Sequence, residues 1–407
     1  MKAIFESMVF IEENSCGFFR VRCEPMNRSP RIKHLKILQV CSSRSWGGME
    51  MHVPILASKL QQRGHDVVVA AFPKSRIHRA SVSYGVPYIP LKVTSYCHPV
   101  QIKKIAEWLR FHPVNVVHCH YSKDLWAVVP ALKMAGKVPL ILVKHIGTQK
   151  PKRDILHRFL YKNVDFIIAN SNIICQNILN THPVTPKQVG MIHLGIDMQR
   201  FSPNSALRRE VRREFGYTAE NLVIGIVGRL QVGKGHLEFL KMAEYLGERY
   251  SHLRFLIIGG ATYGEEAEAA QIRMKVQNSP LQNQIRLTGF RNDIHRLLNA
   301  LDIFVFPSHA EAFGLVLLEA MATGLPVVSS NCDGVVDIVT NRVEGLLVPP
   351  KEVAQLTAAV EELVQSPELR HRLGQKGRQK VKAQFDLEQM VDKIEDLYFT
   401  LALSNNR

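Results

Sequence analysis

Residues 301–330 read LDIFVFPSHAEAFGLVLLEAMATGLPVVSS, and this stretch decides the fold of the chain. The apolar run 303–306 predicts a buried strand, a helix-like run opens at Phe313–Gly314, and a second strand begins before residue 330. Strand, loop, helix and strand in this order form the repeating unit of a parallel α/β sheet. Ligands of such sheets lie beyond the carboxyl ends of the strands. Glu311 in the loop and Glu319 in the helix therefore lie where a ligand would be held.

The same order recurs at the start of each half of the chain. The predicted elements are strand 37–40, loop 41–48, helix 50–62 and strand 67–71, then strand 222–227, loop 228–235, helix 236–248 and strand 254–258. Two such starts predict two doubly wound, Rossmann-like parallel-sheet domains in tandem. We place these domains at 33–202 and 203–385, followed by a closing helix, 386–407, that packs back toward the N-terminal domain.

The bulk properties indicate a globular protein. The 407 residues exceed one ordinary core, and no uninterrupted apolar run of about 18 residues could form a membrane-spanning helix. Seven scattered cysteines without a CxxC pair favour neither a disulfide framework nor a zinc site, so we expect a cytoplasmic protein. Glutamates interrupt the apolar part of residues 1–32, which makes a poor signal peptide. We interpret this extension as disordered or as preceding a true start at Met26.

The net positive charge of the chain lies in its front half. Residues 1–200 contain 28 Lys and Arg against 11 Asp and Glu, whereas residues 201–407 contain 24 against 25. A one-sided basic field raises the local concentration of anionic partners, such as nucleic acid, an anionic membrane or a phosphorylated substrate. A basic surface that only aids solubility is the alternative.

Glycines and polar residues follow the predicted strands of the front half. They are Gly47, Gly48 and Glu50 after the first strand, His118 and His120 around the end of strand 114–119, His145 after strand 139–143, and Asn170 after strand 164–169. Glycines in the first loop permit close approach of the backbone to a ligand. We expect His118 and His120 to lie on opposite faces of their strand, so that only one of them reaches the ligand. No third ligand accompanies this pair, so a metal site is not expected.

Loop 228–235 carries two cations, Arg229 and Lys234, among glycines. Such a loop offers positive charge and backbone N–H groups to a diphosphate. It is not the phosphate loop of nucleotide hydrolases, because the GxxxxGK[ST] string is absent.

Taken together, these motifs resemble the retaining nucleotide-sugar glycosyltransferases of family four (glycosyl transferases group 1). The resemblance implies the GT-B fold, in which two Rossmann-like domains face a central cleft. The resemblance covers roughly residues 35–403. It is carried by the two glutamates eight residues apart in EAFGLVLLEA (311–320) and by 47–50, 118–120, 170–171, 195–197 with 201–203, 228–229 with 234–235, and 289–290.

The resemblance implies a role for each candidate residue. Arg229 and Lys234 would hold the diphosphate of a nucleotide-sugar donor, together with Gly48 and with the start of the helix at Gly314 and Leu315. Glu319 would bind the nucleotide ribose, and Glu311 would act at the transferred sugar. His120 would be the second catalytic residue. Gly47, Glu50, His145 and Asn170 would lie on the acceptor side, in the N-terminal domain.

The chain departs from the family pattern in one loop and lacks one common motif. Asp333 replaces a glycine and Asp337 replaces the more usual glutamate of the family's Gly-Gly-x-x-Glu loop, which puts donor binding by that loop in question. No Asp-x-Asp string is present, so we expect neither a metal ion nor another cofactor. Because Glu319 is assigned to ribose, no spare nucleophile for a double displacement is evident, and we favour front-face attack by the acceptor.

The basic N-terminal domain predicts an anionic glycan or glycolipid acceptor and peripheral binding to the inner face of the cytoplasmic membrane. Lipopolysaccharide core is our first expectation, with teichoic-type polymers and phospholipid-linked glycans as alternatives. No nucleic-acid-binding module is recognisable. Two other functions stay open: a sugar-nucleotide epimerase of the same fold, and a non-enzymatic binder of nucleotide sugars or nucleic acid.

Overall fold

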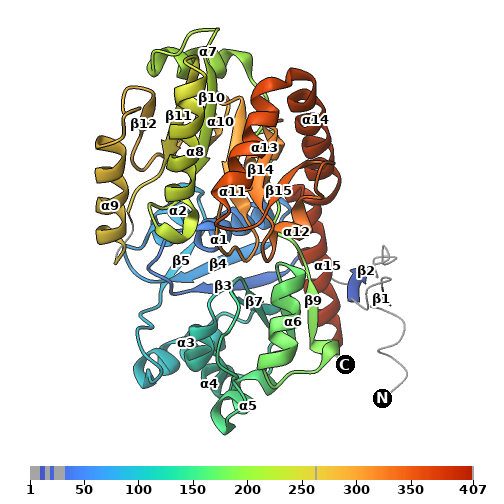
Figure 1. The fold of residues 1–407 in the computed structure, drawn as a ribbon. Helices are drawn as coiled ribbons and strands as arrows, with labels where there is room; N and C mark the ends of the chain where they lie inside the picture. Colours follow the sequence, from blue (N-terminus) through green and yellow to red (C-terminus); the bar gives the residue numbers. More distant parts are fainter. Residues whose placement is uncertain (1–9, 14–18, 23–32, 262–263, 406–407) are drawn as a thin grey trace. The chain divides into compact units, whose positions relative to one another are not determined.

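The computed structural model describes residues 10–13, 19–22, 33–261 and 264–405 (Figure 1). It divides into two compact units, Met1–His193 with Gln389–Arg407 (unit 1) and Leu194–Glu388 (unit 2). Within the N-terminal extension, strands β1 (Phe10–Glu13) and β2 (Phe19–Arg22) pair antiparallel. The expected start at Met26 lies outside the described residues.

Unit 1 is built on a seven-stranded sheet whose neighbouring strands all pair parallel, in the order β5-β4-β3-β6-β7-β8-β9. The strands are β3 (Lys36–Cys41), β4 (Asp66–Ala71), β5 (Tyr88–Pro90), β6 (Val116–Cys119), β7 (Leu140–Lys144), β8 (Phe166–Ala169) and β9 (Val189–Met191). The helices are α1 (Gly48–Gln62), α2 (Arg76–Ser83), α3 (Pro99–Phe111), α4 (Leu125–Ala135), α5 (Ile155–Lys162) and α6 (Asn172–Thr181).

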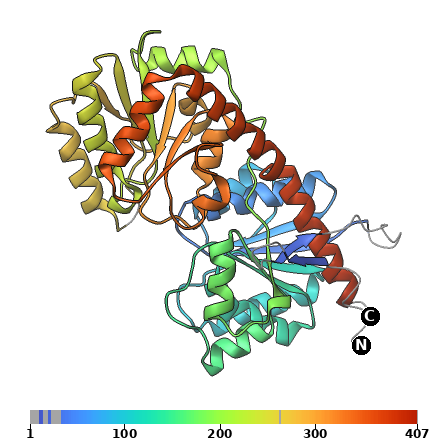
Figure 2. The same cartoon turned by 45° about the vertical axis from the view of Figure 1, so that its right-hand side comes forward.

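The last helix, α15 (Leu387–Asn405), also belongs to unit 1 from Gln389 onward (Figure 2). The Oη of Tyr398 lies 2.5 Å from Nδ1 of His118, and Oε1 of Glu395 lies 2.7 Å from Nε2 of His65. Both contacts tie the C-terminal helix to residues more than 250 positions earlier, because α15 supplies polar partners to groups that the sheet leaves buried.

Unit 2 has a six-stranded parallel sheet in the order β12-β11-β10-β13-β14-β15 (Figure 1). Its strands are β10 (Leu222–Val227), β11 (Leu253–Ile258), β12 (Ile285–Leu287), β13 (Ile303–Phe306), β14 (Val327–Ser330) and β15 (Gly345–Val348). Its helices are α7 (Ser205–Glu214), α8 (His236–Arg249), α9 (Glu266–Gln277), α10 (Ile294–Leu298), α11 (Leu315–Ala322), α12 (Val335–Ile338), α13 (Val353–Gln365) and α14 (Pro367–Gln384).

The central strand β13 shows why these strands read as continuous apolar runs. Ile303 and Val305 belong to one hydrophobic cluster, whereas Phe304 and Phe306 belong to the other. Successive residues of a strand point to opposite faces of the sheet. Because helices cover both faces, every position of the strand is buried and must be apolar.

Both sheets reverse their strand order at one place. In unit 1, β3 pairs with β4 on one side and with β6 on the other, and in unit 2, β10 pairs with β11 and β13. A crevice opens at such a switch point, beyond the carboxyl ends of the two central strands. The loops after β3 and β6, and after β10 and β13, therefore border the places where ligands are expected.

The predicted fold class, two doubly wound parallel-sheet α/β domains, is confirmed, with differences in detail. Helix α1 begins at Gly48 rather than at residue 50, and α11 begins at Leu315, just after the expected Phe313–Gly314. The units change at His193–Leu194 and at Glu388–Gln389, whereas the sequence placed its boundaries at 202 and 385. The backbone of Ile196 accounts for the first difference, since it bonds with Phe385 and Leu387 of unit 2.

Gly235, in the loop after β10, is closely packed, whereas Gly216 elsewhere in unit 2 is not. Gly235 (φ +77°) and Gly216 (φ +71°) share the left-handed conformation, but a Cβ on Gly235 would lie 2.1 Å from the carbonyl oxygen of Pro307, and one on Gly216 meets nothing within 4 Å. We expect Gly216→Ala to lower the free energy of unfolding by roughly 1–2 kcal/mol. Gly235→Ala should cost a further 1–3 kcal/mol or so, because the two loops must separate.

Urea unfolding of the two variants measures this difference. Equal losses for Gly216→Ala and Gly235→Ala would contradict the close packing of the loop after β10 against Pro307.

Candidate active site

The switch point of unit 2 joins a cation to a carboxylate. Lys234 ends the short 3-10 turn Val232–Lys234 after β10, and Glu311 lies in the loop after the neighbouring strand β13. The Nζ of Lys234 donates to Oε2 of Glu311 at 2.6 Å, and both side chains are largely buried. Two of the residues singled out from the sequence are thus direct partners, although 77 positions separate them.

Residues after β14 hold Glu311 in place. Its backbone N–H donates to Oδ2 of Asp333 at 3.0 Å, and the N–H of Gly334 donates to the carbonyl of Glu311 at 2.9 Å. A Cβ at Gly334 would lie 2.2 Å from the carbonyl oxygen of Ala312, so only glycine fits this approach. Asp333 departs from the family pattern. In this chain its carboxylate accepts the backbone hydrogen bond of Glu311 and so fixes the loop that carries Glu311.

Arg229 lies on the same loop as Lys234 and also has an acidic partner. Its guanidinium forms an ion pair with Glu265 at the start of α9, while about half of the arginine side chain is exposed. The Arg229 carbonyl lies 2.8 Å from Nε2 of His236, whose pKa burial lowers to about 4. The neutral imidazole donates this hydrogen bond and fixes the backbone beneath the guanidinium.

Glu319 lies on the partly buried side of α11, next to the fully buried Leu317 and Leu318. Burial raises the pKa of Glu319 to about 7, and the charge of Arg200 opposes this shift. Among the described residues, none donates a hydrogen bond to its carboxylate. A carboxylate on an apolar helix is costly without donors, so this group suits a ligand that brings hydroxyls. Gly314, with φ +95°, precedes the first turn of the helix at Leu315.

In unit 1, Glu50 shapes the glycine loop after β3. Its carboxylate accepts from Oγ of Ser43 at 2.6 Å and from the N–H of Gly47 at 3.0 Å, which caps α1 immediately before Gly48. Glu50 is buried, and both of its carboxylate oxygens are engaged by this loop. Its observed contacts are therefore those of a residue that positions Gly47 and Gly48.

Sequence reasoning missed Asp124, which closes the switch point of unit 1. Its fully buried carboxylate accepts from the hydroxyl and, at 2.9 Å, from the backbone N–H of Ser42, joining the loop after β6 to the loop after β3. Burial raises the pKa of Asp124 to about 6. The only sequence signal was a lone acid in a basic, apolar segment.

The prediction that His118 and His120 lie on opposite faces is wrong. Residues two apart in an extended segment share a face, and the two ring centroids lie 4.2 Å apart. The His145 ring stacks 6.5 Å from that of His120. Burial lowers the pKa of His118 and of His145 to about 3, and that of His120 well below its usual value. All three imidazoles are therefore neutral at physiological pH.

Several buried polar atoms at this edge of the sheet have no hydrogen-bond partner in the described chain. They are both ring nitrogens of His120 and of His145, Nε2 of His118, Oδ1 of Asn170 and the side-chain amide of Gln39. Buried polar groups are normally paired. The carboxyl edge of the sheet in unit 1 therefore carries polar groups that are suited to hydrogen-bond with a ligand.

Neither a metal-binding cluster nor a membrane-spanning helix is present among the described residues. In the ranges that the structure covers, no group of three or more His, Cys, Asp or Glu side chains is arranged to hold a metal ion. Nor is any helix in that part of the chain both long enough and apolar enough to cross a membrane.

Two parallel-sheet Rossmann-like units in tandem are the architecture of the GT-B class of glycosyltransferases. The chain belongs to this class through both of its halves: residues 46–200 match the model of Glycosyltransferase Family 4, and residues 208–380 match that of Glycosyl transferases group 1.

Two named glycosyltransferases align with most of the chain. A D-inositol 3-phosphate glycosyltransferase of Corynebacterium jeikeium is 25% identical over 92% of this chain and 96% of its own length. An Escherichia coli UDP-Gal:alpha-D-GlcNAc-diphosphoundecaprenol alpha-1,3-galactosyltransferase is 28% identical over 73% of this chain and 78% of its own.

Among solved structures, a Rickettsia africae glycosyltransferase matches with a TM-score of 0.82 (21% identity; 91% of this chain and 99% of the other). Anabaena HepE in complex with UDP and glucose matches with a TM-score of 0.77 (21% identity; 89% and 99%). At 21% identity, these two structures show that the fold is shared and nothing more.

The raised pKa of Glu319 predicts a pH-dependent stability. Since the folded value, about 7, exceeds the ordinary 4.5, the stability that this residue contributes is complete below about pH 4.5 and is lost as the pH rises through 7. Glu319→Gln should therefore match wild type at pH 4 and exceed its free energy of unfolding at pH 8, by on the order of 2 kcal/mol.

Urea unfolding at the two pH values provides the measurement. Glu248→Gln, which alters an exposed glutamate of α8 in the same unit, is the control and should change neither value. A Glu319→Gln variant that gains nothing at pH 8 would show that the carboxylate is well solvated.

Proposed function

We propose that this protein transfers a sugar from a nucleotide-diphosphate sugar to a hydroxyl of an anionic glycan or glycolipid, with retention of anomeric configuration and without a metal ion. The observation that carries the proposal is the meeting of Lys234 and Glu311 at the switch point of unit 2. Arg229 and Glu319 lie in the same unit, on the loop after β10 and on α11.

A donor diphosphate is the ligand that best fits the two cations. As the glycosidic bond breaks, the leaving nucleotide gains negative charge, and groups already placed to stabilise that charge lower the barrier. Lys234 and Arg229 supply two positive charges from one loop, and the first turn of α11 adds backbone N–H groups after Gly314. In support, the E. coli relative's name contains UDP-Gal, and the Anabaena structure contains UDP and glucose.

Donor binding would exchange the partners of these charges. The diphosphate would take Lys234 from Glu311 and Arg229 from Glu265, the two carboxylates to which they are now bonded. Glu311, released but still held by its backbone bonds to Asp333 and Gly334, would accept hydrogen bonds from hydroxyls of the transferred sugar. It would also stabilise positive charge at the anomeric carbon.

Glu319 would bind the ribose of the nucleotide. A carboxylate accepts hydrogen bonds from two neighbouring hydroxyls at once, and that of Glu319 receives none from the described chain. Hydrogen bonds to the charged form lower a carboxyl pKa. Donor binding would therefore reverse the upward shift that burial imposes on Glu319.

Retention would follow from attack by the acceptor on the face that the nucleotide leaves. The acceptor oxygen forms the new bond to the anomeric carbon, the bond to the β-phosphate oxygen breaks, and that oxygen takes the acceptor proton. His120, neutral and without a partner, would hold a sugar hydroxyl, and His145 and Asn170 would serve the acceptor. Because Glu319 is assigned to ribose, it is not available as a second carboxylate for a double displacement.

The basic first half supports an anionic acceptor and an anionic membrane surface as partners. Its excess of cations, 28 against 11 acids in residues 1–200, falls on the part of the chain that forms unit 1. A lipopolysaccharide core is our leading acceptor, and peripheral binding on the inner face of the cytoplasmic membrane would bring it within reach.

A panel of UDP-, GDP- and ADP-sugars should identify the donor. A ligand that binds only the native state raises the melting temperature, so one nucleotide class should shift wild type. Glu319→Ala, which removes the ribose contact, should shift less at the same concentration. Glu248→Ala, in the same unit, should respond as wild type does. A panel without any shift, or with equal shifts in Glu319→Ala, would refute the donor assignment.

The front-face mechanism predicts that no covalent glycosyl-enzyme intermediate forms. Mass spectrometry of the protein, quenched during turnover of the donor identified by the panel, should therefore show only the unmodified mass. A glycosyl adduct on Glu311 would instead establish a double displacement.

A further inference from the structure

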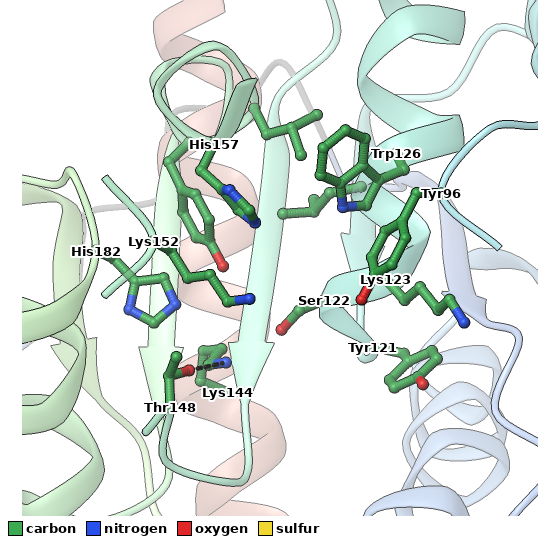
Figure 3. A pocket seen from close by; sticks show the side chains of 13 residues that line it. Tyr96, Tyr121, Ser122, Lys123, Trp126, Lys144, Thr148, Lys152, His157 and His182 are labelled. Carbon is green, nitrogen blue, oxygen red and sulfur yellow. Dashed lines mark hydrogen bonds between the residues drawn. The ribbon is translucent and has the colours of Figure 1, made fainter. Parts of the chain in front are cut away.

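Unit 1 contains a pocket of about 170 Å³ at the carboxyl ends of β6 and β7 (Figure 3). This volume is several times the roughly 30 Å³ that one water occupies in the liquid. Three lysines line it: Lys123 after β6, Lys144 at the end of β7, and Lys152 before α5. None of the 13 lining residues is acidic. The pocket is therefore strongly positive.

Lys144 is the most informative of the three. Its side chain is buried, and its ammonium donates to Oγ1 of Thr148 at 3.2 Å (Figure 3). Within the described residues no carboxylate pairs with it. Burial, followed by the charge of Lys152, lowers the pKa of Lys144 to about 8, so it is still mostly charged at neutral pH. A buried cation without a counter-charge is unfavourable, and an anion in the pocket would relieve it.

His182 provides a second, independent sign of a ligand. The residue is buried and lines the pocket, and its Nε2 has no partner in the described chain. The hydroxyl of Thr181 donates to the carbonyl of Asn177, so it accepts from Nδ1 of His182 at 2.8 Å. Nδ1 therefore carries the proton and Nε2 is an acceptor. An acceptor pairs with a donor rather than with a deprotonated phosphate oxygen, so a ligand that also carries a hydroxyl fits this site best.

Aromatic rings form the opposite wall. Tyr96 meets Trp126 at 5.3 Å and Trp126 meets His157 at 5.5 Å, both edge to face, and the ammonium of Lys123 lies 5.3 Å from the centre of the Tyr96 ring. His157 is itself held by the carboxylate of Asp154, at 2.5 Å. Flat apolar surfaces beside a few polar groups are usual in sites for small organic molecules.

The pocket adjoins the unpaired histidines of the same unit. Tyr121 and Lys144 line the pocket, and each is the immediate neighbour in sequence of a clustered histidine, His120 or His145. Adjacent residues of an extended segment point to opposite sides. Tyr121 and Lys144 therefore face the pocket, while His120 and His145 point to the other side of the same two segments.

We propose that this pocket binds the phosphate group of the acceptor, a phosphorylated sugar or polyol, with Lys144 and Lys152 on the phosphate and Nε2 of His182 accepting from a hydroxyl. This inference rests on the proposed glycosyl transfer, since it assigns the acceptor of that reaction. The phosphate anchors the acceptor at one end and leaves its remaining hydroxyls for the transfer.

Calorimetric titration with inorganic phosphate, glucose 6-phosphate and glucose tests the pocket without any donor. Wild type should bind glucose 6-phosphate most tightly, inorganic phosphate more weakly, and glucose hardly at all. Lys144→Met should weaken both phosphate ligands about tenfold or more, because a charge-assisted bond is lost. Lys133→Met, the same change at an exposed position of α4, should bind as wild type. Equal binding by Lys144→Met and Lys133→Met would overturn the proposal.

A second readout guards against a misfolded variant. Because Lys144→Met removes a buried, uncompensated charge, its ligand-free melting temperature should be equal to or above that of wild type. Glucose 6-phosphate should then raise the melting temperature of wild type but not that of Lys144→Met. His182→Phe should lose the preference for glucose 6-phosphate over inorganic phosphate while keeping phosphate binding. A variant that keeps the preference would exclude His182 as the hydroxyl acceptor.

Sedimentation with vesicles distinguishes a lipid headgroup from a free phosphate ester. If phosphatidylglycerol vesicles bind wild type, are displaced by glucose 6-phosphate and fail to bind Lys144→Met, the phosphate in the pocket is a headgroup. If glucose 6-phosphate binds through Lys144 while vesicles do not compete, the acceptor is soluble. Both results support the pocket. Vesicle binding in the absence of any binding of soluble phosphates contradicts it.

The nucleotide-sugar panel on Lys144→Met separates this inference from the proposed function. The variant should keep the donor-induced shift, since the charged donor residues Arg229, Lys234 and Glu319 lie in unit 2. Phosphate binding without any donor shift in wild type would refute the glycosyl transfer and leave the anion site in place. A donor shift without phosphate binding would refute the pocket alone.

Discussion

The ion pair between Lys234 and Glu311 is the interaction on which the site of unit 2 depends. It joins the loops after β10 and β13, the two strands between which the sheet reverses its order. Gly235 lets the first loop lie against Pro307, and Asp333 with Gly334 fixes the backbone of Glu311. In an open α/β sheet this is where a ligand enters. The pair keeps both charges neutralised and in position, and under the proposed function a donor diphosphate would replace the carboxylate.

The two units differ in how their buried polar groups are paired. In unit 2 the cations Arg229 and Lys234 already have carboxylate partners, so a ligand must compete for them. In unit 1 the ring nitrogens of His120 and His145 have none in the described chain, and Lys144 has no acid. Unpaired groups are tolerated at functional sites when a ligand completes them. The contrast suits a reaction in which one substrate exchanges existing ion pairs and the other fills vacant hydrogen bonds.

The fold could be predicted because its signals are local. Apolar runs such as 222–227 and 303–306 are short, end at glycine or proline and alternate with helices, which leaves few topologies besides a parallel sheet. Lys234, Glu311 and Glu319 could be singled out because they are charged residues beside such runs. The contacts could not be: nothing local links Lys234 to Glu311 or Asp124 to Ser42, since strand order brings them together. The histidine prediction failed for a simpler reason, a misapplied two-residue period.

A crystal structure of the protein with the diphosphate nucleotide of its donor tests the central claim most directly. The account predicts β-phosphate oxygens within hydrogen-bonding distance of Nζ of Lys234, with that ammonium no longer bonded to Glu311, and ribose hydroxyls on Glu319. A nucleotide bound elsewhere, or bound while the Lys234–Glu311 pair stays intact, would contradict it.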